Sequence, residues 1–235
     1  MMCSEEQGER TDPSSSASIP TMTAPSTGHI ILLGDSIFDN GSYTLGEPDV
    51  VGHLASLIPW TWRATLLAVD GATTADVVSQ MDRVPRDASH LVLSVGGNDA
   101  LLNSDLLEAP ARSSSDVLLM FASRVDAFEK AYRCLIDRLM ALKRDLTICT
   151  IYNGALDPEL ARPARVALMT FNDVILRVAF AHHASVIDLR GICVERSDYA
   201  NPIEPSGKGG WKIASAIARA VGATPGARES RVITG

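Results

Sequence analysis

Five short apolar runs lie along the chain, and each is long enough to form one strand. They cover residues 29–33, 63–69, 90–95, 146–152 and 185–189. The runs are rich in Val, Ile, Leu and Thr and are apolar almost throughout, with little alternation between apolar and polar positions. Strands that are buried on both faces have this pattern, so we predict a parallel sheet covered by helices on each side.

Segments with helical periodicity separate these runs. The clearest spans residues 115–143, where apolar side chains recur at steps of three and four. Five helices are predicted, over residues 48–58, 74–82, 115–143, 159–181 and 206–221. Strands that alternate with helices predict an α/β fold, here a three-layer sandwich around a five-stranded parallel sheet with flavodoxin-like order.

The composition supports one domain. Of the 235 residues, 46% are hydrophobic and 21% are charged, which is enough for one sizeable core over residues 29–222. Residues 1–28 are rich in Ser, Thr and Pro, begin acidic and contain no apolar stretch of the kind that a secretory signal needs. We therefore expect a disordered tail and a cytoplasmic location. Residues 223–235 are predicted to be a frayed C-terminal tail.

The net charge of −7 and the pI near 5.2 narrow the choice of partners. Nucleic acids and anionic membranes favour a basic face, and no apolar run approaches the length of a membrane span, so neither partner is expected. The cysteines have no CxxC spacing, and no His, Cys and Asp cluster has metal-ligand spacing. We expect reduced thiols, no metal and no cofactor.

Three of the predicted strands end in short polar turns. Ser36 follows the first strand in the segment GDSIFDN, Gly71 follows the second, and Asn98 follows the third in the segment GGND. The carboxyl ends of parallel strands meet at the edge of the sheet where ligands bind, so we expect these residues to lie close together. Asp35 and Asp39 flank the serine and are expected to bond backbone N–H groups of the turn and fix its shape.

The order GDSIFDN, glycine and GGND resembles that of the SGNH (GDSL-like) hydrolase family, from His29 to about Val221. The resemblance implies that family's fold and a serine hydrolase that cleaves small carboxylic esters through an acyl-enzyme on Ser36. It also implies that Gly71 and Asn98 donate to the oxyanion together with Ser36. Preorganised donors of this kind stabilise the tetrahedral intermediate of acyl transfer.

The chain departs from the family in its closing DxxH element, which usually supplies the histidine base and its orienting aspartate. Here Asn201 occupies the aspartate position and Glu204 occupies the histidine position. We expect Glu204 to be the base, held by an amide hydrogen bond from Asn201. Two other bases, His53 and Asp198, stay open, as does a structural role for Glu204 at the start of the last helix.

Two other functions also remain open. A binding module would keep the pocket of a hydrolase but lack the histidine base. A flavodoxin-like nucleotide or receiver domain fits the strand order but leaves the GGND segment unexplained. The sequence predicts neither the acyl and alcohol groups of an ester substrate nor an oligomeric state. Residues 103–116 are expected to shape the pocket as a loop.

Overall fold

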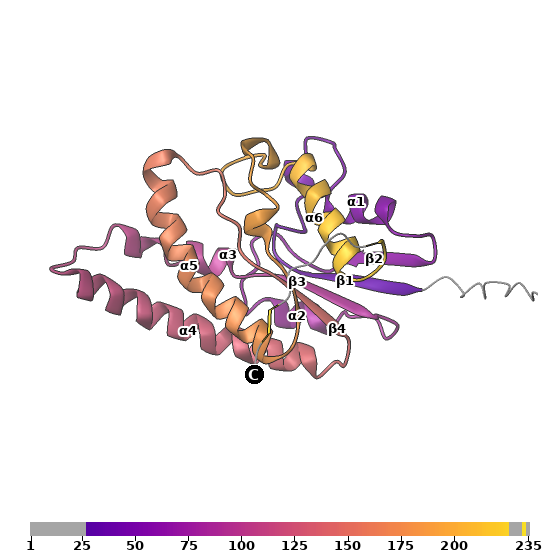
Figure 1. Ribbon diagram of the computed structural model, residues 1–235, viewed down its shortest axis with the longest axis horizontal. Coiled ribbons are helices and arrows are strands. Elements are labelled where there is room, and N and C mark those ends of the chain that lie inside the picture. Colours follow the sequence, from indigo (N-terminus) through magenta and orange to yellow (C-terminus); the bar gives the residue numbers. More distant parts are fainter. Residues whose placement is uncertain (1–26, 226–231, 234–235) are drawn as a thin grey trace, which may run out of the picture.

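A five-stranded sheet lies at the centre of the computed structural model, which describes residues 27–225 and 232–233 (Figure 1). All strand pairs are parallel, and the order is β2-β1-β3-β4-β5. The strands are β1 (Gly28–Gly34), β2 (Trp62–Leu66), β3 (His90–Ser94), β4 (Asp145–Cys149) and β5 (Ser185–Ile187). This confirms the predicted α/β class, the five parallel strands and their flavodoxin-like order. The predicted tails lie almost entirely outside the described residues.

Six α-helices and four short 3-10 helices connect the strands in the described residues. The α-helices are α1 (Val50–Leu57), α2 (Val77–Met81), α3 (Gly97–Leu101), α4 (Ser114–Met140), α5 (Pro158–Ala181) and α6 (Gly207–Ala220). The 3-10 helices are η1 (Gly41–Tyr43), η2 (Ser104–Leu107), η3 (Leu189–Gly191) and η4 (Arg196–Asp198). All five predicted helices are present, and α3 is an additional one that begins inside the GGND segment.

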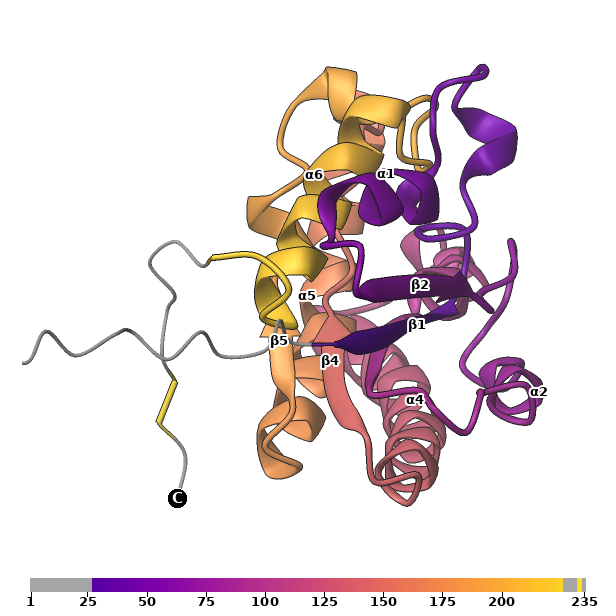
Figure 2. The same cartoon turned by 90° about the vertical axis from the view of Figure 1, so that its right-hand side faces the viewer.

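The helices cover both faces of the sheet, which explains why the strand runs are apolar throughout (Figure 2). Ile30 and Leu32 of β1 pack into the core under α1 and α6. Ile31 and Leu33, which point to the opposite face, pack into the core formed with α2, α4 and α5. Each strand position is therefore buried whichever way its side chain points.

Four predicted strand runs extend beyond the strands in the structure, and those of β2 and β4 extend furthest. The chain leaves β2 at Leu67, because Leu67 and Ala68 both donate their N–H groups to the same acceptor, the Leu32 carbonyl. After β4, Thr150 still donates to the Ile187 carbonyl of β5, and Ile151 bonds to the side chain of Asn172 in place of a neighbouring strand. In both cases residues that follow the strand stay buried without pairing as a strand, although Val69 at the end of the first run is exposed.

Gly34 ends β1 with a backbone conformation that requires glycine. Its φ is +126°, and a Cβ atom at this position would lie 1.7 Å from the Ser94 carbonyl oxygen of β3. The chain can therefore bend sharply toward Ser36 while remaining in contact with β3. None of the helices in the described part of the chain combines the length and hydrophobicity needed to cross a membrane.

Candidate active site

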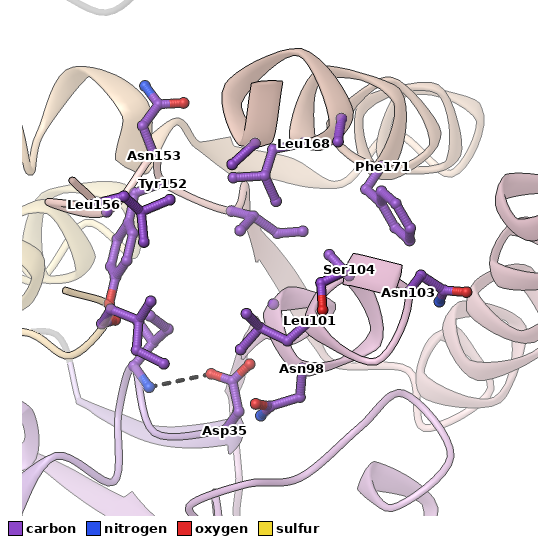
Figure 3. A pocket seen from close by; sticks show the side chains of 18 of the residues that line it. Asp35, Asn98, Leu101, Asn103, Ser104, Tyr152, Asn153, Leu156, Leu168 and Phe171 are labelled. Carbon is purple, nitrogen blue, oxygen red and sulfur yellow. Dashed lines mark hydrogen bonds between the residues drawn. The ribbon is translucent and has the colours of Figure 1, made fainter. Parts of the chain in front are cut away.

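A cavity of about 130 Å³ opens at the carboxyl edge of the sheet, where the chain leaves β1, β3 and β4. Ser36, Asn98 and Glu204 line this cavity together, although they are far apart in the sequence. Figure 3 shows the side chains of Asp35 and Asn98 close to each other at one end, with Leu101, Leu168 and Phe171 farther along the wall. The cavity thus has a polar end beside the serine and an apolar body.

Ser36 lies in a tight turn directly after β1 and is 7% exposed. The turn is fixed on both sides: Asp35 donates its N–H to the Ser94 carbonyl, and Phe38 and Asp39 donate theirs to the Asp35 carbonyl. The N–H of Ser36 has no hydrogen-bond partner among the described residues. This N–H is therefore available to a ligand at the point where the hydroxyl is presented.

Glu204 is 6% exposed, and its carboxyl interacts with the Ser36 side chain. Burial raises the pKa of this carboxyl, and the charge of Asp70 raises it further, while the interaction with Ser36 opposes the rise. The second oxygen, Oε2, has no hydrogen-bond partner in the described structure. A carboxylate with a raised pKa is a stronger base than an exposed one, and it is in place to accept the serine proton.

Asn201 positions Glu204 through the backbone and makes no bond to its carboxyl. Its Oδ1 accepts the N–H groups of Ile203 and Glu204, each at 2.9 Å. The expected amide hydrogen bond to the carboxyl of Glu204 was therefore wrong in its detail, because the side chain of Asn201 turns back on its own loop. The structural role considered for Glu204 is filled by another residue: Ser206 is the N-cap of α6, and its Oγ accepts the N–H of Gly209.

Gly71 follows β2 in a left-handed conformation with a φ of +79°. The preceding residues are tied to the serine turn, since Val69 donates to the Gly34 carbonyl at 3.0 Å and Asp70 donates to Asp39 Oδ2 at 2.9 Å. The N–H of Gly71 has no partner among the described residues, and Gly71 does not line the cavity. Asp39 thus bonds the neighbouring loop and not, as expected from the sequence, its own turn.

Asn98 stands in α3 and lines the cavity beside Ser36. Its Nδ2 donates one hydrogen to the carbonyl of Ala72, at 2.9 Å, which leaves the second amide hydrogen without a protein partner in the described chain. The same bond joins α3 to the loop that carries Gly71. The N–H groups of Ser36 and Gly71 and the second amide hydrogen of Asn98 are therefore donors without a protein partner in the described chain, and they follow three neighbouring strands, β1, β2 and β3.

Asp35 has a further property that the sequence did not reveal. It is 2% exposed, and burial raises its pKa to about 8, with the charges of Glu204 and Asp99 adding to the rise. Its Oδ1 accepts the N–H of Ile37 at 3.1 Å, which confirms the expected turn-shaping bond. Burial therefore favours the neutral form of Asp35 at pH 7.

The other candidate bases lie away from the cavity. None of the five histidines lines it: four stand near the amino ends of β1, β3 and β5, and His53 lies in α1 with its ring against Gly210 of α6. Asp198 is fully buried and accepts bonds from two backbone N–H groups and from Lys212. No group of three or more His, Cys, Asp or Glu side chains in the described residues is arranged to hold a metal ion.

The apolar body of the cavity was not identified from the sequence. Its walls include Phe121 of α4, Ile151 after β4, and Leu168 and Phe171 of α5. The helical periodicity of α4 and α5 marked such residues only as a buried face. The predicted loop over 103–116 does contribute to the cavity, but through Asn103 and the helix η2.

Solved structures with the same α/β fold are similar to this chain over most of its length. A lipase from the goat rumen metagenome has a TM-score of 0.65 and 19% identity, covering 83% of this chain and 97% of its own. The extracellular lipase of Streptomyces rimosus has a TM-score of 0.61 and 19% identity, covering 83% and 100%. An acetylxylan esterase of Geobacillus stearothermophilus has a TM-score of 0.61 and 18% identity, covering 85% and 97%. At these identities the likeness extends to the fold alone.

A search of curated proteins found no match. A family model for GDSL-like lipases and acylhydrolases matches residues 32–210, which is most of the chain and includes the serine turn, the GGND segment and the Asn201–Glu204 loop. This chain therefore belongs to the GDSL-like lipase/acylhydrolase family.

Proposed function

We propose that this protein hydrolyses carboxylic esters of aliphatic acids through an acyl-enzyme on Ser36. One observation carries the proposal: the Ser36 hydroxyl meets the carboxyl of Glu204 at the polar end of a cavity whose remaining walls are largely apolar. Membership of the lipase/acylhydrolase family supports ester hydrolysis as the general reaction.

The first half of the reaction forms the acyl-enzyme. Ser36 Oγ attacks the ester carbonyl carbon while Glu204 takes the hydroxyl proton. The electron pair of the C=O π bond moves to oxygen, and the resulting oxyanion is held by the N–H groups of Ser36 and Gly71 and by the amide of Asn98. When the intermediate collapses, the bond to the alcohol oxygen breaks. Glu204 returns its proton to that oxygen, and the alcohol leaves.

The second half repeats these steps with water as the nucleophile. The water oxygen attacks the acyl carbonyl carbon while Glu204 accepts a proton from the water, and the same donors hold the second oxyanion. Collapse then breaks the bond to Ser36 Oγ, which recovers its proton from Glu204, and the free acid is released. Glu204 can serve in both halves because burial raises its pKa above the usual value near 4.3.

The shape of the cavity favours an acyl chain over a polar group. Leu101 of α3, Phe121 of α4 and Leu168 of α5 line the cavity. Each methylene of an acyl chain that binds there is transferred from water to an apolar environment. Such a transfer contributes about 0.8 kcal/mol per methylene. We therefore expect butyrate and octanoate esters to be better substrates than acetate esters.

The test compares p-nitrophenyl acetate, butyrate and octanoate with the wild type, Ser36→Ala and Glu204→Gln. The wild type should hydrolyse the esters, and Ser36→Ala should fall to the buffer rate. Glu204→Gln should lower kcat by roughly 10²- to 10⁴-fold, the range for loss of general-base catalysis. Mass spectrometry of the wild type after a rapid quench should find the acyl group on Ser36. If the wild type matches the buffer rate with all three esters, the proposal fails.

Three observations favour the second candidate, a binding module. Glu204 has no charged partner to orient it, Oε2 has no bonded partner in the described structure, and no histidine reaches Ser36. Labelling by a small fluorophosphonate separates the two functions. Fast labelling of Ser36 that slows in Glu204→Gln supports the hydrolase, whereas absence of labelling in the wild type supports the module.

A further inference from the structure

Gly34 immediately precedes the Asp35-Ser36 turn, and its backbone pairs with a strand on only one side. On the β3 side, Gly34 pairs with Ser94. On the other side, the last pair between β1 and β2 is Leu32 with Leu66, because the chain then bends away from β2 toward Gly71. On this side the Gly34 carbonyl is reached only by the Val69 N–H, beyond the end of β2, and the Gly34 N–H has no backbone partner among the described residues.

Gln80 of α2 supplies that partner. Its Oε1 accepts the N–H of Gly34 at 2.8 Å, and its Nε2 donates to the carbonyl of Gly34 at 2.8 Å. Gln80 is 2% exposed, so both bonds are shielded from water. One side-chain amide thus accepts the Gly34 N–H, which has no backbone partner, and gives the Gly34 carbonyl a donor in addition to the backbone.

The same carbonyl also fixes the loop that carries Gly71. The Gly34 oxygen accepts the N–H of Val69 at 3.0 Å in addition to the bond from Gln80. Val69 lies two residues before Gly71, and Gly34 lies two residues before Ser36. The bonds to Gly34 therefore connect the serine turn to the loop of an oxyanion donor.

We propose that Gln80 is a positioning residue for catalysis, which holds Gly34 so that Ser36 Oγ and the Gly71 N–H keep the spacing that the tetrahedral intermediate needs. The inference rests on the proposed function for the role of Ser36. Gln80 does not line the cavity, so it acts through Gly34 alone. Its loss should reduce kcat and the rate of serine labelling while leaving substrate binding nearly unchanged.

Asn172 of α5 offers an internal comparison. Its Oδ1 accepts the N–H of Ile151 and its Nδ2 donates to the carbonyl of Ile151, both at 2.8 Å. The chemistry matches that of Gln80, and the side chain is 1% exposed. However, Ile151 belongs to the wall of the cavity and not to the serine turn. Loss of this amide should therefore raise KM more than it lowers kcat.

The experiment uses the full chain with Gln80→Met, which removes both bonds at similar volume, and Gln80→Glu, which keeps only the acceptor for the Gly34 N–H. Val178→Ala, in the core of α5 away from the cavity, controls for a general loss of stability. Each variant is measured for its thermal midpoint, kcat and KM with p-nitrophenyl butyrate, and the rate of fluorophosphonate labelling. Asn172→Leu is measured in the same way.

Gln80→Met should lower kcat and the labelling rate by about 30-fold, within the range expected when a reacting group shifts by about 1 Å, with KM within about threefold of the wild type. Gln80→Glu should fall between Gln80→Met and the wild type. The inference is overturned if Gln80→Met stays within threefold of Val178→Ala in kcat and labelling, or if its defect appears in KM alone. Should Gln80→Met fail to fold, the same criterion applies to Gln80→Glu.

Failure of the proposed function gives a different result: the wild type itself then neither turns over ester nor labels. Amide hydrogen exchange tests the role of Gln80 in that case as well, because it needs no activity. The Gly34 and Val69 amides should be protected in the wild type and should exchange at least tenfold faster in Gln80→Met than in Val178→Ala. Equal exchange in these two variants would show that Gln80 does not hold the turn.

Discussion

Replacement of Asp35 by asparagine should change how the stability of the fold depends on pH. Asp35 is almost fully buried beside Ser36, and burial raises its pKa to about 8. In the unfolded chain the same carboxyl has an ordinary pKa of about 3.9. Between these two values the folded protein retains a proton that the unfolded chain has released.

The direction and size of the effect follow from this difference. Because the folded-state pKa is the higher one, the stabilisation is complete below about pH 4 and is lost as the pH rises toward 8. The limiting slope is a loss of about 1.4 kcal/mol in the free energy of unfolding per pH unit, so Asp35 should cost about 3 kcal/mol between pH 5 and pH 7. Asparagine has no proton to lose and keeps an oxygen that can accept the Ile37 N–H.

The assay is guanidinium chloride unfolding at pH 5, 6, 7 and 8, followed by tryptophan fluorescence. The free energy of unfolding of Asp35→Asn minus that of the wild type should increase by about 3 kcal/mol from pH 5 to pH 7. Asp82→Asn, which removes an exposed carboxylate, controls for the change in net charge. Parallel stability curves for Asp35→Asn and the wild type would refute the reasoning, because they would mean that Asp35 ionises alike in both states.

Three further predictions concern the base, the cavity and the core. Because burial raises the pKa of Glu204, kcat/KM should fall with decreasing pH, and the midpoint of this fall should lie above about pH 4.3. Glu204→Gln should abolish this pH dependence. A midpoint at or below about pH 4.3, the usual pKa of a glutamate, would contradict the assignment of Glu204 as the base. Ala167→Trp should fill the cavity and lower kcat/KM for p-nitrophenyl octanoate by more than about 10-fold, with acetate changed less than about threefold; equal losses for the two esters would argue against an acyl site. Lys212→Met should leave Asp198 buried without its cation and lower the free energy of unfolding by about 3 kcal/mol in guanidinium chloride, whereas an unchanged midpoint would show that the backbone bonds to Asp198 suffice.

Much of the fold could be predicted because its signals are local. Uninterrupted apolar runs such as 29–33 predict strands that are buried on both faces, and the core residues on both sides of β1 explain why the pattern does not alternate. Parallel order then places every strand exit at one edge. This is why Ser36 and Asn98, which are separated by more than sixty residues, could be placed in one site from the sequence.

Predictions failed where a residue's partner depended on packing. Asn201 was expected to hold the carboxyl of Glu204, but an Asn side chain close to free backbone N–H groups bonds those first. The run 63–69 continues past the end of β2, because burial under neighbouring helices selects apolar residues whether or not the backbone pairs. Gln80 gave no sequence signal, since a polar residue on a short helix is usually exposed and this one is buried against Gly34.

The sequence by itself determined the α/β architecture and the order of the strand exits, which bring Ser36 and Asn98 to one cavity. These depend on hydrophobic periodicity and on turn chemistry, which act over a few residues. Only the tertiary structure decided that Glu204 meets Ser36, that burial favours the neutral form of Asp35 at pH 7 and that α4 and α5 enclose an apolar cavity. Those properties arise from burial and from contacts between distant segments, which raise carboxyl pKa values and shape cavities only after the layers have packed.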